Sequence, residues 1–277
     1  MIVEALDLAL LYANNCKRNL RLLAPATPPV TRIHRFVKEF FGVSTIEHSH
    51  VQKLTTVIDD VLAALLDPSL TSLDSKRFVT GTSRTNPRSH VAFTIPGDVE
   101  RKIYLAGSFF STDFHIYQPH LIIPFDIDAH ARASTLIHEL THIVCGTEDI
   151  AYLESERPFQ DLLAVETGKH LKETLQDIRT KTLSILTPVN ELFQILDGAT
   201  DTWLDPGTTV DTDHIENHIL NLTGGTDLDD ARRIFRADPL KRIDTLLGNA
   251  DSVAYLITQL GRQLDPVPSS RPVSPIP

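Results

Sequence analysis

The sequence predicts an α+β fold, mostly helical, with a small antiparallel β-sheet beside one central helix. Apolar residues recur at the helical period of about 3.6 residues over most of the chain. The period changes to two only around residues 90–106, which is typical of strands. The chain has 277 residues, 42% of them hydrophobic and 22% charged, so it can bury a sizeable core.

Three helices are expected before residue 67, because apolar residues share one face in each segment and a proline or glycine follows it. The expected ranges are 2–23, 31–41 and 47–66. Gly42 is a candidate C-cap, since glycine adopts the left-handed conformation that ends many helices. Residues 71–90 are polar and rich in turn formers, so a turn-rich connection is expected there.

Two strands are expected at His90–Ile95 and Arg101–Ala106, where apolar and polar residues alternate. The sequence Pro-Gly-Asp at 96–98 is typical of a hairpin connection, so the two strands should pair in antiparallel fashion. Residues 119–127 are apolar but contain prolines, and they are expected to form a loop.

The central helix is expected at residues 129–145. Asp128 is a candidate N-cap, because its side-chain oxygen can accept hydrogen bonds from free backbone N–H groups of the first turn. Gly146 follows the last helical residue and allows the chain to reverse direction there.

The C-terminal half is expected to be helical, with one turn-rich interruption at Asp205-Pro206-Gly207. Helical patterns cover about 158–186, 188–197, 228–236 and 238–262. Residues 263–277 are too rich in proline to fold alone and are expected to be a disordered tail.

The chain is acidic, because 26 Lys and Arg residues against 36 Asp and Glu residues give a formal net charge of −10. Such a chain repels nucleic acid, so no nucleic-acid partner is expected. No apolar run reaches the ~20 residues of a membrane span, and the N-terminus lacks the basic region of a signal peptide. We therefore expect secretion or translocation without a cleaved signal peptide, with a cytoplasmic location as the alternative. Cys16 and Cys145 are expected to be free thiols.

The central helix carries the motif His138-Glu139-Leu140-Thr141-His142. Four residues advance about 400° around a helix, so both imidazoles project from one face, one turn apart. This separation lets both histidines bind one tetrahedral zinc ion, while Glu139 can lie beside the metal and activate its water. The motif is surrounded by apolar residues, and its polar side chains would be costly to bury without a partner. The sequence therefore predicts one Zn²⁺ bound to His138 and His142.

A third protein ligand is expected, because a catalytic zinc usually has three protein ligands and one water. Several downstream carboxylates have suitable chemistry: Glu148, Asp149, Glu154, Glu156, Glu166 and Glu173. Gly146 favours Glu148 or Asp149, because a chain reversal there would return the next residues to the metal.

The stretch HELTHIVCGTEDIAY (138–152) resembles the deuterolysin and peptidyl-lysine metalloendopeptidase family, the aspzincins. The family signature joins His-Glu-x-x-His to Gly-Thr-x-Asp-x-x-Tyr-Gly, and residues 146–152 fit the second element up to the tyrosine. Leu153 stands where the family has the final glycine. The resemblance implies a zincin-like metalloprotease fold with Asp149 as the third zinc ligand. It also implies that Tyr152 stabilises the oxyanion formed during peptide hydrolysis.

Three other segments are similar to the family: 36–42, 102–110 and 249–252. By this resemblance, the second segment contains an edge strand that binds an extended substrate. The substrate-binding residues would be Tyr104, Leu105, Ala106 and Gly107. Asp251 would line the pocket for the side chain that follows the scissile bond. Ala254 stands where the lysine-specific members have a second acid, so strict lysine specificity is not expected.

Residues 153–228 stand where the family has only a short link. We therefore expect a zincin-like peptidase domain formed by residues 1–152 and 229–262, with a helical insertion at 153–228. The insertion is a candidate lid, or a binding surface for a target protein or an inhibitor.

The expected function is zinc-dependent hydrolysis of peptide bonds in protein substrates, with Glu139 as general base and Tyr152 as the second catalytic residue. An exported effector or toxin is a natural extension, because the chain has few cysteines, no signal peptide and a helical insertion. Two alternatives stay open. One is a catalytically silent zinc-binding module of the same fold, and the other is a zinc hydrolase acting on a non-peptide substrate.

Four further histidines are interpreted as surface residues. His214 and His218 are four residues apart and have the spacing of a second metal site, but an exposed polar helix face is the preferred interpretation. His48 and His50 are likewise expected at the surface.

Overall fold

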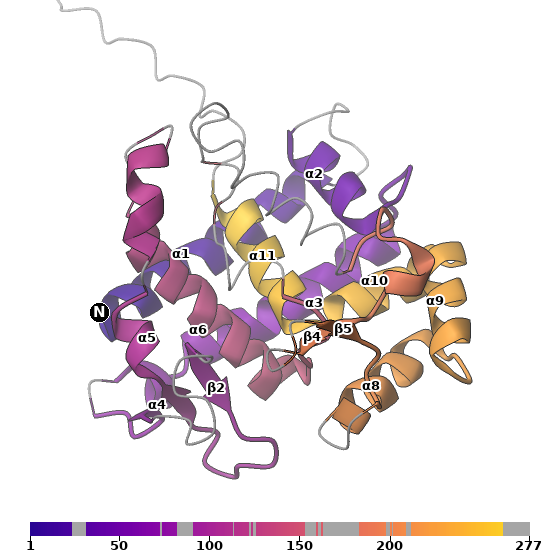
Figure 1. Ribbon diagram of the computed structural model, residues 1–277. Coiled ribbons are helices and arrows are strands. Elements are labelled where there is room, and N and C mark those ends of the chain that lie inside the picture. The colour runs from indigo at the N-terminus through magenta and orange to yellow at the C-terminus, as the bar shows by residue number, and fades with distance from the viewer. Residues whose placement is uncertain are drawn as a thin grey trace, which may run out of the picture.

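The computed structural model of the chain is mostly helical, with two small β-sheets (Figure 1). This agrees with the expected α+β class. The structure describes residues 1–23, 32–72, 74–81, 91–112, 114–121, 123, 126–152, 159, 162, 183–197, 200, 202–208 and 212–262.

Helix α6 (Ile127–Cys145) runs through the centre of the molecule and is buried along most of its length. Three helices pack around it: α1 (Ile2–Leu20), α3 (His48–Leu65) and α11 (Ala250–Gly261) (Figure 1). Every residue of α11 is buried, and Asp251 is its only charged residue. A helix that is apolar on nearly all sides is stable only in the interior. The two buried helices α6 and α11 therefore form the middle of the core.

Three further helices pack on one another at one end of the molecule, drawn in orange and yellow in Figure 1. These are α8 (Asp213–Thr223), α9 (Leu228–Ala237) and α10 (Pro239–Leu247). Helix α10 joins this group to the core, because it also contacts α2 (Arg32–Phe41), α3 and α11. The described part of the expected insertion thus includes a helix, α8, that packs on residues assigned to the peptidase domain.

Short helices complete the described chain. They are η1 (Arg21–Leu23), α4 (Pro68–Thr71), α5 (Gly107–Phe110), η2 (Phe114–His120) and η4 (Val189–Glu191). Residues 119–127, expected as a loop, contain the end of η2 and the start of α6.

The larger sheet has three strands in the order β1-β3-β2. Strand β1 (Phe78–Thr80) is parallel to β3 (Ile103–Leu105), and β2 (Ala92–Thr94) is antiparallel to β3. Strand β2 also packs against α6. The predicted hairpin of β2 and β3 is confirmed, but the expectation of a purely antiparallel sheet is wrong, because β1 forms within the segment predicted to be only turns.

The predicted edge strand occupies the centre of this sheet. Both sides of β3 are paired, one with β1 and the other with β2, so it has no free edge for a substrate. The free edge beside α6 belongs to β2 among the described strands.

The predicted helix ends in the N-terminal half are close to those observed. Gly42 and Gly146 both have the left-handed conformation, with φ of 62° and 64°, which confirms their capping role. Helix α6 begins two residues earlier than expected, because Asp126 and not Asp128 accepts the hydrogen bond from the backbone N–H of Ala129. His50 is buried and not at the surface, since its Nδ1 accepts the backbone N–H of Glu47 at the start of α3.

The C-terminal predictions need more correction. The helix expected at 188–197 is wrong, because this segment forms η4 and then strand β4 (Ile195–Asp197), which pairs with β5 (Thr202–Leu204). The helix expected at 238–262 is divided into α10 and α11 at Gly248 and Asn249. Most of the helix expected at 158–186 and all of the tail at 263–277 lie outside the described residues.

One buried arginine joins distant helix ends. The guanidinium of Arg242 donates to the carbonyl oxygens of Phe41 and Gly42 at the end of α2, at 2.8 and 2.9 Å. It also donates to those of Phe235 and Arg236 at the end of α9, at 2.9 and 3.0 Å. Helix ends leave carbonyl oxygens without intrahelical partners, so Arg242 of α10 satisfies two helix termini at once.

Two other expectations concern the whole chain. Cys16 and Cys145 are both unpaired, which confirms the prediction of free thiols. Among the described residues, no helix combines the length and the apolar character needed to cross a membrane.

Candidate metal centre

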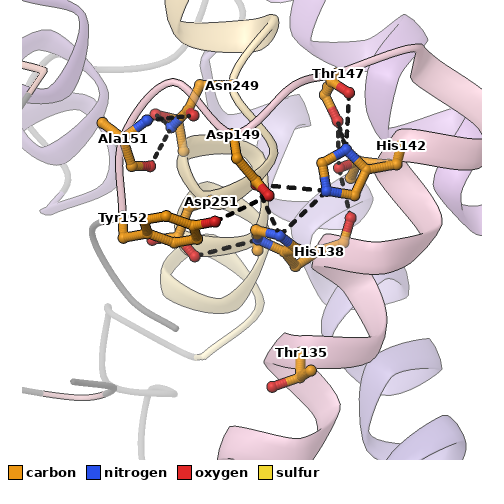
Figure 2. A network of polar contacts seen from close by, with 12 residues as sticks. Thr135, His138, His142, Thr147, Asp149, Ala151, Tyr152, Asn249 and Asp251 are labelled. Atoms are coloured by element: carbon orange, nitrogen blue, oxygen red, sulfur yellow. Dashed lines mark hydrogen bonds and ion pairs between the residues drawn. The ribbon is translucent and has the colours of Figure 1, made fainter. Parts of the chain in front are cut away.

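Helix α6 places both histidines of the motif on one face, one turn apart (Figure 2). His138 and Glu139 are buried, and the side chain of His142 is 16% exposed. These residues lie in the last two turns of the helix.

The chain reverses directly after α6 and returns Asp149 to the two histidines. Gly146 makes the reversal, and a Cβ at this position would meet no atom within 4 Å, so the glycine serves the backbone conformation. The Oδ1 atom of Asp149 lies 3.1 Å from Nε2 of His138 and 3.4 Å from Nε2 of His142 (Figure 2).

The three facing atoms form a nearly equilateral triangle, since the two Nε2 atoms are 3.3 Å apart. Bonds from zinc to nitrogen or oxygen are about 2.0–2.1 Å long, so two ligand atoms at a tetrahedral angle are separated by about 3.3 Å. The observed edges of 3.1, 3.3 and 3.4 Å fit three corners of such a site. Within the described part of the chain, His138, His142 and Asp149 are the residues whose ligand atoms group closely enough to hold a metal.

Three buried polar atoms at this centre have no hydrogen-bond partner among the described residues: Oδ1 of Asp149, Oε2 of Glu139 and Nδ1 of His138. An unsatisfied buried polar atom costs about 1–3 kcal/mol, and more when it is charged. A cation with a bound water would satisfy both oxygens, so the residues present fit a metal ion.

A backbone contact orients His142. Its Nδ1 donates to the carbonyl oxygen of Thr147 at 2.7 Å, so Nε2 is the nitrogen that is left to face the centre. Thr147 is held in turn by a hydrogen bond of 2.8 Å between its hydroxyl group and that of Thr141 on α6. The loop after the helix thus fixes the ring of a ligand on the helix.

A buried carboxylate faces the outer ring nitrogen of His138. The Oδ1 atom of Asp251 lies 3.3 Å from Nδ1 of His138, and the Asp251 side chain is 1% exposed. This is the carboxylate–histidine arrangement that outer partners of metal ligands commonly have. The structure thus gives Asp251 a different position from the expected substrate pocket, since its carboxylate faces the ring of a candidate ligand.

Tyr152 contacts the third ligand. Its hydroxyl donates to Oδ2 of Asp149 at 3.0 Å, and its ring stacks on that of His138 with the centroids 6.3 Å apart. The two carboxylate oxygens of Asp149 therefore have separate partners, Oδ1 facing the histidines and Oδ2 facing the phenol (Figure 2). Although Tyr152 is 38% exposed, burial of its hydroxyl group and the adjacent Asp149 raise its pKa well above the ordinary value.

Glu139 differs from the ligands in its surroundings. Burial raises the pKa of its carboxyl group to about 7, against the opposing effect of the two neighbouring imidazoles. A carboxyl group with a pKa near 7 can take up and release a proton near neutral pH.

The three candidate ligands also shift one another's pKa values. Burial lowers the pKa of His138 and of His142, but the carboxylate of Asp149 outweighs this effect and raises both above the ordinary value. Burial raises the pKa of Asp149, but the two imidazoles outweigh it and hold that pKa well below the usual range. Asp149 is therefore ionised, which is the form that binds a metal.

Sequence reasoning missed the role of Asn249. This residue holds the loop of residues 146–152, which follows α6, carries Asp149 and is called the ligand loop below. Asn249 lies just before α11, and its side-chain oxygen accepts the backbone N–H groups of Ile150 and Ala151 at 2.9 and 3.0 Å (Figure 2). Its amide nitrogen donates to the carbonyl oxygen of Ala151 at 2.9 Å. An asparagine before an apolar segment indicates a helix cap, and nothing in the local pattern indicates a contact with a loop 98 residues away.

The four expected substrate-binding residues lie at and just after β3. Leu105 and Ala106 are buried, and Tyr104 stacks on Phe93 of β2. Gly107 begins α5. The structure therefore puts Tyr104 and Leu105 in the central strand and Ala106 and Gly107 beyond its end, so none of the four lies along an open edge of the sheet.

The register of β2 shows which backbone groups face outward. The backbone N–H of Ala106 donates to the carbonyl oxygen of Val91, so Val91 and Ala106 are a hydrogen-bonded pair. Such pairs alternate along an antiparallel ladder, so Phe93 and Tyr104 form the next one. The N–H and C=O groups of Ala92 and Thr94 consequently point to the opposite edge, with which no described strand pairs.

The other carboxylates considered as third ligand do not reach the centre where they are described. The side chain of Glu148 lies 3.7 Å from Nε2 of His214, away from the histidines of the motif. His218, on the same helix α8, makes a hydrogen bond of 3.0 Å with the carbonyl oxygen of Gly248, so it is not on a purely exposed face. Glu154, Glu156, Glu166 and Glu173 lie outside the described residues.

The comparisons with known proteins identify no relative of this chain. No family model matches the sequence, and no curated protein or solved structure shows significant similarity to it.

Proposed function

We propose that this protein is a zinc metalloendopeptidase in which His138, His142 and Asp149 hold the metal and Glu139 is the general base. The observation that carries the proposal is the triangle of ligand atoms beside a buried Glu139 oxygen without a hydrogen bond. Three protein ligands leave a fourth position for water, whereas a structural zinc site is closed by four.

The proposed roles follow from the positions of the side chains. When bound, zinc would polarise the scissile carbonyl group and lower the pKa of a water molecule to about 7. Glu139 would take a proton from the attacking water and deliver it to the leaving amine. The Tyr152 phenol is protonated at neutral pH. Its single proton, which goes to Oδ2 of Asp149 in this structure, would turn to the oxyanion of the substrate.

The proposed substrate is an extended polypeptide that pairs with the free edge of β2. This strand packs against α6, and Ala92 and Thr94 direct their backbone groups to that edge. Backbone hydrogen bonds at a strand edge bind a peptide with little regard to its sequence. Strand β2 therefore replaces residues 104–107 as the proposed binding element.

We also propose that the protein is a member of the aspzincin family and has a zincin-like fold. Its support is that the residues matched to the family signature, from His138 to Tyr152, meet at one centre. An exported effector or toxin, secreted or translocated, is the proposed setting. Residues 153–228 are the proposed surface for a target protein or an inhibitor.

The test combines zinc content with product mapping. Wild-type protein and Glu139→Gln are each analysed for bound zinc and incubated with an unfolded protein mixture, with and without a chelator. We expect one zinc per chain in both, chelator-sensitive cuts by the wild type, and turnover reduced by a factor of at least about 100 in the variant. Glu148→Gln is the matched control, because Glu148 is a nearby glutamate, next to Asp149 in the chain, whose side chain faces His214.

Each outcome decides between the candidate functions. Zinc binding without any cut by the wild type would contradict the peptidase and favour the catalytically silent module or a hydrolase of a non-peptide substrate. Full turnover by Glu139→Gln would show that another group acts as general base. Absence of bound zinc in the wild type would contradict the metal centre itself.

A further inference from the structure

The loop that carries Asp149 and Tyr152 is bound to the start of α11 by a short set of hydrogen bonds. The backbone N–H of Glu148 donates to the carbonyl oxygen of Gly248 at 3.0 Å, and that of Ala250 donates to the carbonyl oxygen of Glu148 at 3.1 Å. Glu148 and Asn249 form an isolated parallel bridge. The loop therefore rests on α11 through backbone contacts on one side of Asp149.

The side chain of Asn249 holds the loop on the other side of Asp149. It accepts the N–H groups of Ile150 and Ala151 and donates to the carbonyl oxygen of Ala151. Its second amide proton goes to Oγ of Ser252 at 2.8 Å. All the donor and acceptor capacity of the amide is used, and Asn249 is fully buried.

The position of Asn249 makes these contacts unusual. It is the N-cap residue of α11, where an asparagine oxygen commonly accepts an N–H group of its own helix. Here the side chain makes no such capping bond, and its oxygen is given to the loop. Helix α11 thus begins without its side-chain cap while the loop gains three hydrogen bonds.

We propose that Asn249 is a positioning residue for the metal centre. It touches no ligand atom, yet it fixes the backbone on which Asp149 and Tyr152 stand, and through them the distance between the carboxylate and the two imidazoles. Metal affinity therefore depends on a side chain outside the coordination sphere, as it does for other outer partners of metal ligands. This inference rests on the proposed zinc site.

The chemistry of the amide explains why other residues cannot replace it. Aspartate would accept the two N–H groups but could not donate to Ala151 or Ser252, and it would bury a charge. Serine is an equally good N-cap residue, but its hydroxyl is too short to reach both sides of the loop. Asn249→Ser therefore removes the hold on the loop while offering α11 a side-chain cap, whereas Asn249→Ala removes the hold and offers no cap.

The experiment measures zinc affinity separately from folding stability. Zinc is titrated against a competing chelator into the wild type, Asn249→Ser and Asn249→Ala, and the thermal midpoint of each metal-free protein is recorded. Hydrogen exchange of the Ile150 and Ala151 amides reports the hold on the loop. Thr258→Val is the matched control, because Thr258 is also buried in α11 but bonds only within its helix.

We expect Asn249→Ser to bind zinc about tenfold more weakly or worse, with faster exchange at Ile150 and Ala151. Thr258→Val should lower the thermal midpoint and leave zinc affinity unchanged. Zinc affinity equal to that of the wild type in Asn249→Ser, despite faster exchange, would overturn the positioning role and leave the metal site intact. If the alanine variant does not fold, the serine variant alone decides the matter. A wild type that binds no zinc would overturn both this inference and the proposed function.

Discussion

Asp251 and Asn249 stand two residues apart at the start of α11, and each reaches a different part of the candidate metal centre. Asp251 faces Nδ1 of His138, and Asn249 holds the loop that carries Asp149. A carboxylate at Nδ1 keeps the proton on that nitrogen and frees Nε2 for a metal. The start of α11 therefore contacts both the ring of His138 and the loop backbone next to Asp149.

We expect Asp251→Asn to weaken zinc binding by about 10- to 100-fold, because a neutral amide no longer holds the proton on Nδ1 of His138. Cleavage-site preference should stay the same in zinc-saturated protein, because Asp251 is buried against the ring. Chelator competition and product mapping measure the two effects, with Asp229→Asn, at a 92% exposed side chain, as control. A changed side-chain preference with unchanged zinc affinity would return Asp251 to the substrate pocket.

The sequence was informative about residues that act within one helix. The spacing of His138 and His142 places them one turn apart in any helix, so their proximity could be predicted without a fold. Asp149 could be narrowed only to a choice with Glu148 from the residues themselves, and a resemblance supplied the rest. The role of Asn249 could not be predicted, because no local pattern records which loop packs on a helix start.

At the scale of elements, the position of a strand in its sheet decides what it can bind. Strands β2 and β3 have similar alternating sequences, and the hairpin between them was predicted. Which of them lies at the edge depends on β1, a strand of three residues in a segment rich in turn formers. A strand of three residues shows almost no periodicity in the sequence. The central position of β3 could therefore not be predicted.

We expect Ala92→Pro to weaken substrate binding without unfolding the protein. The N–H of Ala92 points away from β3, so proline removes a group offered to the substrate and spares the hydrogen bonds within the sheet. Steady-state cleavage of an unstructured peptide should show a higher KM. Phe93→Pro is the contrasting variant, because it removes an N–H that faces β3 and should lower the thermal midpoint. An unchanged KM in Ala92→Pro would place the substrate elsewhere.

The end of α6 gives a second prediction at this scale. Gly146 has φ of 64°, where a side chain costs about 1–2 kcal/mol, and an added Cβ meets no neighbour. Gly146→Ala should therefore lower the free energy of unfolding by about that amount through backbone strain alone. Urea unfolding measures it, and Gly146→Asn should cost less because asparagine tolerates this conformation. Equal stability of the alanine variant and the wild type would contradict the strain.

At the scale of the whole molecule, Arg242 joins the group of α8, α9 and α10 to the N-terminal helices. Its four hydrogen bonds satisfy carbonyl oxygens at the ends of α2 and α9, which are distant in sequence. The sequence shows only a Lys-Arg pair in a helix, and such a pair is usually exposed. Long-range burial of this kind is fixed by packing, and the local pattern does not report it.

We expect Arg242→Ala to lower the free energy of unfolding by about 3 kcal/mol or more, because several buried carbonyl oxygens lose their donor at once. Urea unfolding of the metal-free protein measures this cost. Arg233→Ala is the control, since the Arg233 side chain is 73% exposed and pairs only with Asp230. A similar, small cost in both variants would show that water replaces the guanidinium.

Prediction of the whole fold succeeded where periodicity alone determines the element. The helices α1, α2, α3 and α6 were found within a few residues of their ends. The division between α10 and α11 was not, because apolar residues recur with helical spacing on both sides of it. Gly248 and Asn249 are local signals of a helix end and a helix start, and the backbone contact of Glu148 with Gly248 and Ala250 lies at the break.

The contact between Asn249 and the ligand loop also sets an order on synthesis. The backbone groups that Asn249 holds are translated 98 and 99 residues before it. A nascent chain therefore carries both histidines long before it can hold Asp149 in place. If the proposed function holds, the metal centre becomes complete only after the start of α11 has been synthesised. A growing chain therefore cannot be cleaved by its own catalytic centre.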